Sequence, residues 1–150
     1  MSQRVLHFIT ELNVGGAERL LAELLPRLDR AKVEAQVACL HGEGPLTAEL
    51  ESQGVRVHAL RSQHKFNLRP AWQLARLLER ERIEILHTHL IQADILGFAA
   101  ARLATTPRVV STKHNVRYYE GRQRWLRPLA RQIENRLDAV VAVSGAVAAE

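Results

Sequence analysis

Two consecutive glycines are the first residues of this sequence whose spacing could support chemistry. Gly15 and Gly16 follow the apolar run 5–9 and come directly before a segment with helical spacing of leucines. Without Cβ atoms, they would let a ligand reach the free N–H groups of a first helical turn, where an anion such as phosphate is favoured. They could instead only form a tight turn, and the third glycine of a dinucleotide-binding G-x-G-x-x-G motif is absent.

Three histidines are the second candidate. His87 and His89 alternate on an apolar run, which places both imidazoles on one side of a strand, and His114 follows the next strand. Three histidines could bind a metal ion. The sequence shows no evident bridging carboxylate and no longer metal-ligand pattern, so we favour hydrogen-bonding roles for His89 and His114 at a cleft. The alternative is that they are only satisfied histidines at strand ends.

Strand-like apolar runs alternate with segments of helical periodicity along the chain. The expected strands cover residues 5–9, 33–40, 55–60, 83–89, 109–112 and 139–143, and the expected helices begin near residues 17, 45, 70, 91 and 122, with Ser144 as the N-cap of a last one. This predicts an α/β fold, a Rossmann-like doubly wound parallel sheet of about six strands in a three-layer αβα arrangement. Ligands bind such sheets at the carboxyl ends of the strands, beside the first one, where the polar segments 13–16, 87–92 and 114–115 fall.

Composition limits the remaining classes. The 150 residues suffice for one packed domain, and the single cysteine, Cys39, excludes an internal disulfide. No apolar stretch reaches the roughly 18 residues of a spanning helix and no signal peptide precedes the first strand, which predicts a cytoplasmic protein. The net charge of +5 favours anionic partners, but an aromatic content of 5%, without a basic stretch with interleaved aromatics, zinc-finger spacing or an RNA-binding signature, argues against nucleic acid.

In combination, these residues resemble the N-terminal domain of retaining GT-B glycosyltransferases of group 1, family 4. The resemblance rests on VGGAE at 14–18 after the first strand, LHTH at 86–89 on the fourth, TKHN at 112–115 after the fifth and VS at 143–144 after the sixth. These pieces occur in the right order on the expected elements and span nearly the whole chain.

The resemblance implies a role for each candidate residue. Gly15 and Gly16 would approach the donor diphosphate, and His114 would be the catalytic residue beside the transferred sugar. Members of the family use no catalytic metal ion and no cofactor, because the nucleotide sugar is a substrate. Four residues would belong to the acceptor-facing half of the cleft: Asn13, His89, Gln92 and Asn115.

The sequence departs from the family pattern in one large respect. These enzymes carry a second Rossmann-like domain with an E-x7-E motif and most nucleotide-sugar contacts, and residues 1–150 contain none of it. We therefore expect the acceptor-side domain of a truncated enzyme, inactive alone. The complete enzyme would transfer a sugar from a nucleotide sugar to a glycan or lipid-linked acceptor, in cell-envelope polysaccharide biosynthesis. The alternatives are a non-catalytic Rossmann-like binding module and a metal-dependent hydrolase using His87, His89 and His114.

An arginine-rich segment near the C-terminal end suggests a peripheral membrane contact. Its basic residues surround Trp125 and could place a helix on anionic lipid at the inner face of the cell membrane. In the alternative, the helix packs on the sheet and keeps its arginines in solvent, with an apolar face formed by Trp125, Leu126, Leu129, Ile133 and Leu137. The basic residues are Arg117, Arg122, Arg124, Arg127, Arg131 and Arg136.

Overall fold

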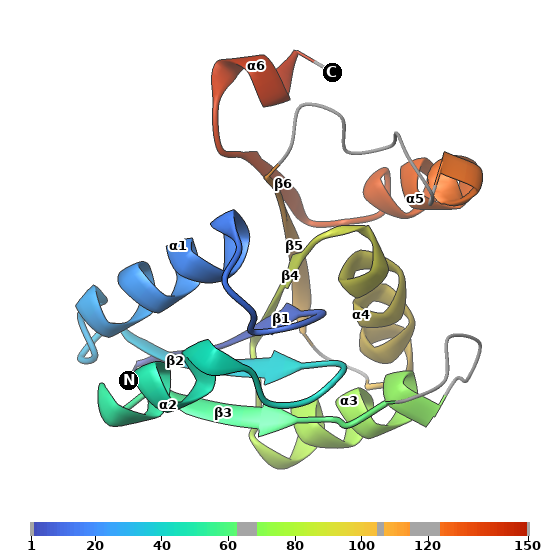
Figure 1. Cartoon of the computed structure of the whole chain (residues 1–150). Coiled ribbons are helices and arrows are strands. Elements are labelled where there is room, and N and C mark those ends of the chain that lie inside the picture. The colour runs from blue at the N-terminus through green and yellow to red at the C-terminus, as the bar shows by residue number, and fades with distance from the viewer. Residues whose placement is uncertain (1, 63–68, 105–106, 115–123, 150) are drawn as a thin grey trace.

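A six-stranded parallel sheet forms the centre of the computed structural model, which describes residues 2–62, 69–104, 107–114 and 124–149 (Figure 1). The strand order is β3-β2-β1-β4-β5-β6, and every neighbouring pair is parallel. The predicted α/β doubly wound fold is therefore confirmed, with β3 and β6 at the edges. The strands are β1 Gln3–Ile9, β2 Val33–Cys39, β3 Arg56–Ala59, β4 Ile85–His89, β5 Arg108–Lys113 and β6 Ala139–Ala142.

Helices cover both faces of the sheet, as Figure 1 shows. One face carries α1 (Gly16–Leu24), which continues as the 3-10 turn Leu25–Arg27, and α2 (Pro45–Ser52). The other face carries α3 (Arg69–Arg80), α4 (Ile91–Leu103) and α5 (Arg127–Glu134), the last preceded by a 3-10 turn at Arg124–Leu126. The short α6 (Gly145–Ala148) follows β6, and the hydroxyl oxygen of Ser144 accepts the Val147 N–H at 3.4 Å, so Ser144 is the predicted N-cap.

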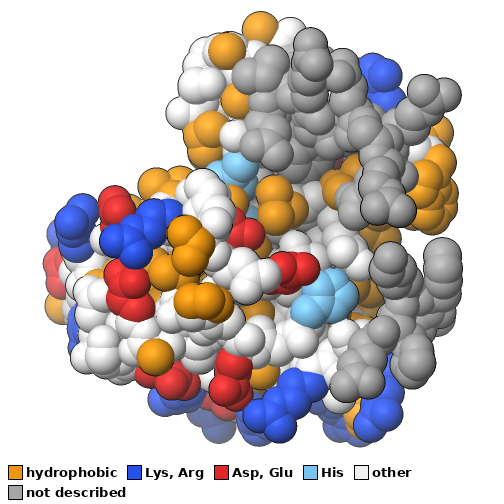
Figure 2. Space-filling view, viewed as in Figure 1, with side chains coloured by type: hydrophobic (Ala, Val, Ile, Leu, Met, Phe, Trp, Pro, Cys, Tyr) orange, Lys and Arg blue, Asp and Glu red, His pale blue; other side chains and the backbone are white. Residues whose placement is uncertain are grey.

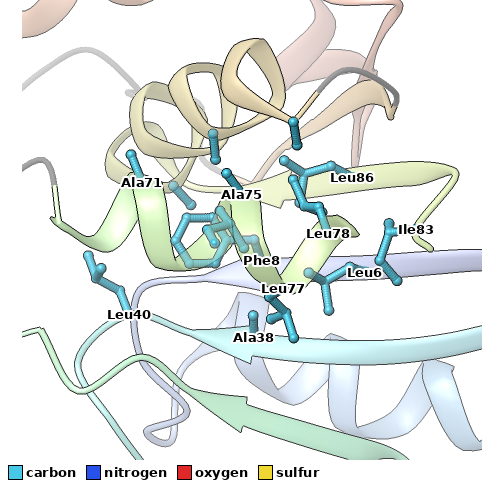
Figure 3. Packing of buried hydrophobic residues seen from close by; sticks show 14 residues of the cluster. Leu6, Phe8, Ala38, Leu40, Ala71, Ala75, Leu77, Leu78, Ile83 and Leu86 are labelled. Atoms are coloured by element: carbon cyan, nitrogen blue, oxygen red, sulfur yellow. The ribbon is translucent and has the colours of Figure 1, made fainter. Parts of the chain in front are cut away.

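The alternation of side chains along the strands divides the core into two layers. Leu6 and Phe8 of β1 point toward α3 and α4, where they pack with Leu86 of β4 (Figure 3). Ile9 points to the opposite face and packs with the buried side of α1 and α2. Gly97 lets α4 approach β4 closely, because a Cβ there would lie 2.5 Å from Cγ2 of Thr88.

The helix α5 differs from the sequence prediction. It packs against α4 through Ala130, with Leu126 of the preceding turn against the same cluster, and only Ala130 and Ile133 of the helix are buried. Trp125 is 63% exposed and Leu129 is 44% exposed, although both were expected to face inward. None of the described helices is long and apolar enough to cross a membrane.

Candidate functional site

The candidate site lies where the chain reverses its direction across the sheet. The strand β1 lies between β2 and β4, and the chain leaves β1 toward α1 on one face and leaves β4 toward α4 on the other. Such a switch point opens a crevice at the carboxyl ends of the strands, which is where α/β sheets bind ligands. The outline of the molecule is indented between α1 and the part that contains β6 and α6, and a histidine side chain reaches the surface near this indentation (Figure 2).

The glycine turn leaves the amino end of α1 accessible. Gly15 is the N-cap in an extended conformation, without a side-chain capping bond, and Gly16 is the first helical residue. Gly16 is exposed, and a Cβ built on it would meet no heavy atom of the described residues within 4 Å. The Glu18 side chain folds back against Gly15, which places a negative group at the positive end of the helix dipole. The first-turn N–H groups, which lack intrahelical partners, therefore lie at an open, electropositive helix end.

Three hydrogen-bonded imidazoles come from β1, from the end of β4 and from the residue after β5. Nδ1 of His7 is 3.1 Å from Nε2 of His89, and Nδ1 of His89 is 3.0 Å from Nε2 of His114. His7 and His89 are buried, whereas His114 is half-buried. His7 of β1 is paired with His87 of β4. His89 lies two residues further along β4, on the same face of the sheet, so its ring reaches His7 from the carboxyl side. The structure therefore brings His89 and His114 together, as predicted, and adds His7.

Burial keeps these imidazoles neutral. Removal from water lowers the pKa of His7 to about 3, with a smaller contribution from His87. The same effect, followed by the charge of His114, lowers the pKa of His87 to about 4. Burial also holds the pKa of His89 well below its usual value and lowers that of His114, which Asp94 partly offsets. Neutral imidazoles each offer one donor and one acceptor near pH 7.

The geometry of the histidines favours hydrogen bonding over metal coordination. Nitrogen atoms of His7, His87 and His89 lie within 4.8 Å of one another, so within the described part of the chain this set, with His7 in place of His114, is the one whose spacing could hold an ion. However, the His89 ring is stacked on His7 and on His87 at interplanar angles of 19° and 23°. Lone pairs in nearly parallel rings do not converge on one ion as tetrahedral ligation requires. Nε2 of His87 also lies 2.6 Å from the Thr112 hydroxyl oxygen.

The other predicted residues are distributed around the same edge. Asn13 is exposed on the turn after β1, where its amide donates to Glu11, and Gln92 is half-buried in the first turn of α4. Asn115 lies outside the described residues. Between His89 and α4, Leu90 adopts φ 75° and ψ 150°, a region that disfavours side chains and costs about 1–3 kcal/mol. Backbone strain at this position is consistent with a functional site.

A buried polar cluster under the site was not predicted. Asp94 is 1% exposed and accepts hydrogen bonds from the hydroxyls of Thr88 at 2.5 Å and Ser111 at 2.7 Å, and from Nζ of Lys113 at 2.7 Å. Lys113 also pairs with Glu134 of α5 at 2.5 Å. These contacts tie the end of β5, directly before His114, to α4 and α5. The signal available in the sequence was a carboxylate at position 94 of a mostly apolar helix.

A cavity of about 930 Å³ lies away from these residues. Phe98 and Arg102 of α4, Val109 of β5 and Arg136 after α5 line part of it. Val109 is near the amino end of β5, whereas His114 follows its carboxyl end. This cavity therefore does not belong to the candidate site.

Comparison with known proteins gives a family match over most of the chain. The profile of the family described as Glycosyltransferase Family 4 matches residues 14–150. The matched segment begins just before Gly15 and includes His89 and His114, so it contains most of the candidate site.

Two curated proteins show the same relationship. The capsular polysaccharide biosynthesis glycosyltransferase CapH of Staphylococcus aureus is 32% identical over 102 residues, which are 65% of this chain and 28% of CapH. The Escherichia coli UDP-Gal:alpha-D-GlcNAc-diphosphoundecaprenol alpha-1,3-galactosyltransferase is 37% identical over 71 residues, 43% of this chain and 18% of that enzyme. The chain therefore spans less than a third of these relatives.

Two solved structures share the fold of this chain. HepE of Anabaena in complex with UDP-glucose superposes with a TM-score of 0.75 at 22% identity, over 96% of this chain and 38% of HepE. A glycosyltransferase from Rickettsia africae superposes with a TM-score of 0.75 at 20% identity, over 95% of this chain and 37% of that protein. At this identity the likeness establishes the fold.

Proposed function

The chain belongs to glycosyltransferase family 4, and from this premise we propose that it is the N-terminal, acceptor-side domain of a retaining GT-B enzyme. In this proposal the complete enzyme transfers a sugar from a nucleotide-sugar donor to a glycan or lipid-linked acceptor. The names of CapH and of the Escherichia coli enzyme, which include capsular polysaccharide and diphosphoundecaprenol, support such an acceptor and a role in cell-envelope polysaccharide synthesis.

One observation carries the proposal: an uncapped, glycine-bearing helix end and a half-buried histidine occur at the same edge of the sheet. The open amino end of α1 suits the diphosphate of the donor, because its N–H groups and dipole favour an anion. The phosphate would compete with the Glu18 carboxylate for this end. His114 follows β5 at the carboxyl edge and suits a contact with the transferred sugar. Asn13, His89, Gln92 and Asn115 remain proposed acceptor-side residues.

The proposal also predicts weak donor binding by this chain. Two backbone hydrogen bonds to a charged group contribute about 1.5–3 kcal/mol each, and a total near 4 kcal/mol corresponds to a Kd of about 1 mM. In the family, the remaining nucleotide contacts come from a second domain. We therefore propose that residues 1–150 alone catalyse no transfer, and turnover of UDP-glucose or GDP-mannose by this polypeptide would contradict that part of the proposal.

Substitution of Gly16 tests the helix-end site. A methyl group at Gly16 meets open space, so Gly16→Ala should leave stability nearly unchanged while covering the approach to the first-turn N–H groups. We expect the Kd for UDP-glucose, measured by NMR titration, to rise about tenfold through loss of one charge-assisted hydrogen bond. Gly145→Ala is the matched control. It adds a methyl to open space at the first residue of the four-residue α6, and we expect an unchanged Kd. Equal affinities of Gly16→Ala and wild type would contradict the phosphate site.

We further propose that the enzyme acts in the cytoplasm and contacts anionic lipid through α5 and the turn before it. Trp125 and Leu129 are exposed there beside the exposed side chains of Arg127 and Arg131. Exposed aromatic and apolar groups among arginines suit a membrane interface. The exposure of Trp125 and Leu129, which were expected to pack inward, favours this contact over the alternative of a helix packed on the sheet.

Liposome sedimentation tests this surface. We expect the chain to bind vesicles with anionic lipid at low salt, and Trp125→Ser to lower the partition coefficient about tenfold, since burying such a side chain contributes about 1.5–3 kcal/mol. Trp72→Ser is the matched control, because Trp72 is 56% exposed on α3 with the Arg76 guanidinium 5.1 Å from its ring centroid. Binding that is insensitive to salt, or lost equally in both variants, would contradict a contact at α5.

A further inference from the structure

The imidazole chain of His7, His89 and His114 has a direction. Both contacts join Nδ1 of one ring to Nε2 of the next, at 3.1 Å from His7 to His89 and at 3.0 Å from His89 to His114. A neutral imidazole carries one proton, so one of its nitrogens donates and the other accepts. His89 uses both nitrogens, and its tautomer therefore fixes the other two. Either all three rings carry the proton on Nδ1, or all three carry it on Nε2.

His7, the buried end of the imidazole chain, distinguishes these two arrangements of protons. His7 is 6% exposed, and its Nε2 has no hydrogen-bond partner in the part of the chain that the structure describes. With protons on Nε2, His7 would bury an N–H donor without an acceptor. With protons on Nδ1, only an acceptor lone pair remains unused. Orphaned buried N–H groups are rarer in proteins than under-satisfied acceptors, so the arrangement with protons on Nδ1 is favoured.

We propose that His7, His89 and His114 form one hydrogen-bond relay in which every imidazole is the Nδ1–H tautomer, so that His114 presents an N–H donor at the strand edge. Nδ1 of His114 has no protein partner within the described residues, and its other nitrogen is held by His89. His7 and His89 are then positioning residues that act through His114. Because this ligand assignment rests on the proposed function, the acceptor atom would be an oxygen of the nucleotide sugar, either a sugar hydroxyl or a phosphate oxygen.

The surroundings keep the relay neutral. The ring centroid of His89 lies 5.3 Å from that of His7, 4.5 Å from that of His87 and 5.2 Å from that of His114. No carboxylate of the described residues contacts the relay directly. The charge of Asp94 acts on His87 and His114 from the opposite face of the sheet, where Lys113 and Glu134 accompany it. Protonation of His89 or His114 would place two N–H donors face to face, and burial opposes this.

The test is a long-range ¹H–¹⁵N spectrum of the ¹⁵N-histidine-labelled, ligand-free chain near pH 7.5. Its two-bond couplings separate Nδ1–H from Nε2–H imidazoles. We expect His7, His89 and His114 each to show a protonated Nδ1 and an unprotonated Nε2, the opposite of the tautomer that dominates in free histidine. An Nε2–H pattern or an averaged signal at His89 or His114 would overturn the proposal. The wild-type spectrum alone decides this point, whether or not a variant folds.

A matched pair of substitutions at His89 tests the positioning role. The carboxamide of Asn can occupy the place of Nδ1 and donate to Nε2 of His114, whereas that of Gln reaches the place of Nε2 next to His7. We expect His114 to remain Nδ1–H in His89→Asn and to shift to a mixture dominated by Nε2–H in His89→Gln. The same His114 spectrum in both variants would overturn the relay.

The measurement also separates this proposal from the proposed function. The tautomers are read without ligand, so they report the relay whether or not the chain binds a sugar nucleotide. Addition of UDP-glucose should then shift the Nδ1 and Hδ1 resonances of His114. Intact Nδ1–H tautomers without any response to UDP-glucose would count against the proposed donor contact and would still support the relay.

Discussion

Replacement of Asp94 by alanine is expected to lower the free energy of unfolding by about 3–5 kcal/mol, because it breaks a buried ion pair from one side. The carboxylate accepts hydrogen bonds from Thr88, Ser111 and Lys113, and Lys113 is only 7% exposed. Without Asp94, the ammonium group keeps Glu134 but loses its fully buried partner. Urea unfolding followed by circular dichroism measures the difference.

Two matched variants separate charge from packing in this cluster. Asp94→Asn keeps the shape and an acceptor for the two hydroxyls, so we expect a smaller loss than for alanine. In the double variant Asp94→Leu with Lys113→Met, both charges are removed together, and we expect most of the stability to return, because apolar replacement of a buried pair is often neutral or stabilising. A decrease of less than about 1 kcal/mol in the free energy of unfolding of Asp94→Ala would contradict the stabilisation that we assign to the buried Asp94–Lys113 ion pair.

The same cluster explains why the end of β5 is well positioned. Lys113 points to the α4 side and is held by Asp94 and Glu134, whereas Thr112 points to the α1 side and contacts His87. The next residue, His114, contacts His89. The strand end is thus fixed from both faces directly before the proposed catalytic side chain, and loss of Asp94 should also disturb His114.

Much of the fold could be predicted because the local signals agree with the tertiary structure. Strand-like runs alternate with segments of helical periodicity, and the short connections between them favour a parallel sheet. In a parallel sheet the carboxyl ends of all strands lie at one edge, so the polar residues that follow the strands were expected at that edge. The cleanly alternating segment 55–60 is an edge strand, as its solvated face indicated. The glycine turn before α1 could also be predicted, because the residues that indicate it lie within six consecutive positions of the sequence.

The unpredicted parts of the site depend on register between distant segments. His7 is the one polar residue in the run 5–9, but its contact with His89 requires β1 and β4 to be neighbours in a particular register. Asp94 and Lys113 are 19 positions apart and meet only because α4 packs on β5. The exposure of Trp125 was missed because α5 packs on α4, which buries a narrower stripe than a sheet would. Spacing along one element does not encode such contacts.

Acidification from pH 6.5 to 5 is expected to destabilise the domain by about 3 kcal/mol through His7 and His87 alone. Burial lowers the pKa of His7 to about 3 and that of His87 to about 4, from 6.5 in the unfolded chain. Below pH 6.5 the unfolded state therefore binds protons that the folded state does not, and the free energy of unfolding falls as pH falls. Each histidine approaches about 1.4 kcal/mol per pH unit well below pH 6.5 and contributes about half of that at pH 6.5, which gives about 1.6 kcal/mol over this interval.

The pH dependence of urea unfolding between about pH 7.5 and 5 measures this effect in a range where most carboxylates stay ionised. His7→Phe removes one buried titrating group and keeps an aromatic ring, so below about pH 6 the slope of the free energy of unfolding against pH should fall by an amount that approaches about 1.4 kcal/mol per unit, whatever its stability at pH 7.5. The slope is the informative quantity because it does not depend on the packing cost of the substitution. A slope equal to that of wild type would show that His7 is protonated as readily in the folded protein as in the unfolded chain, contrary to its burial in the sheet.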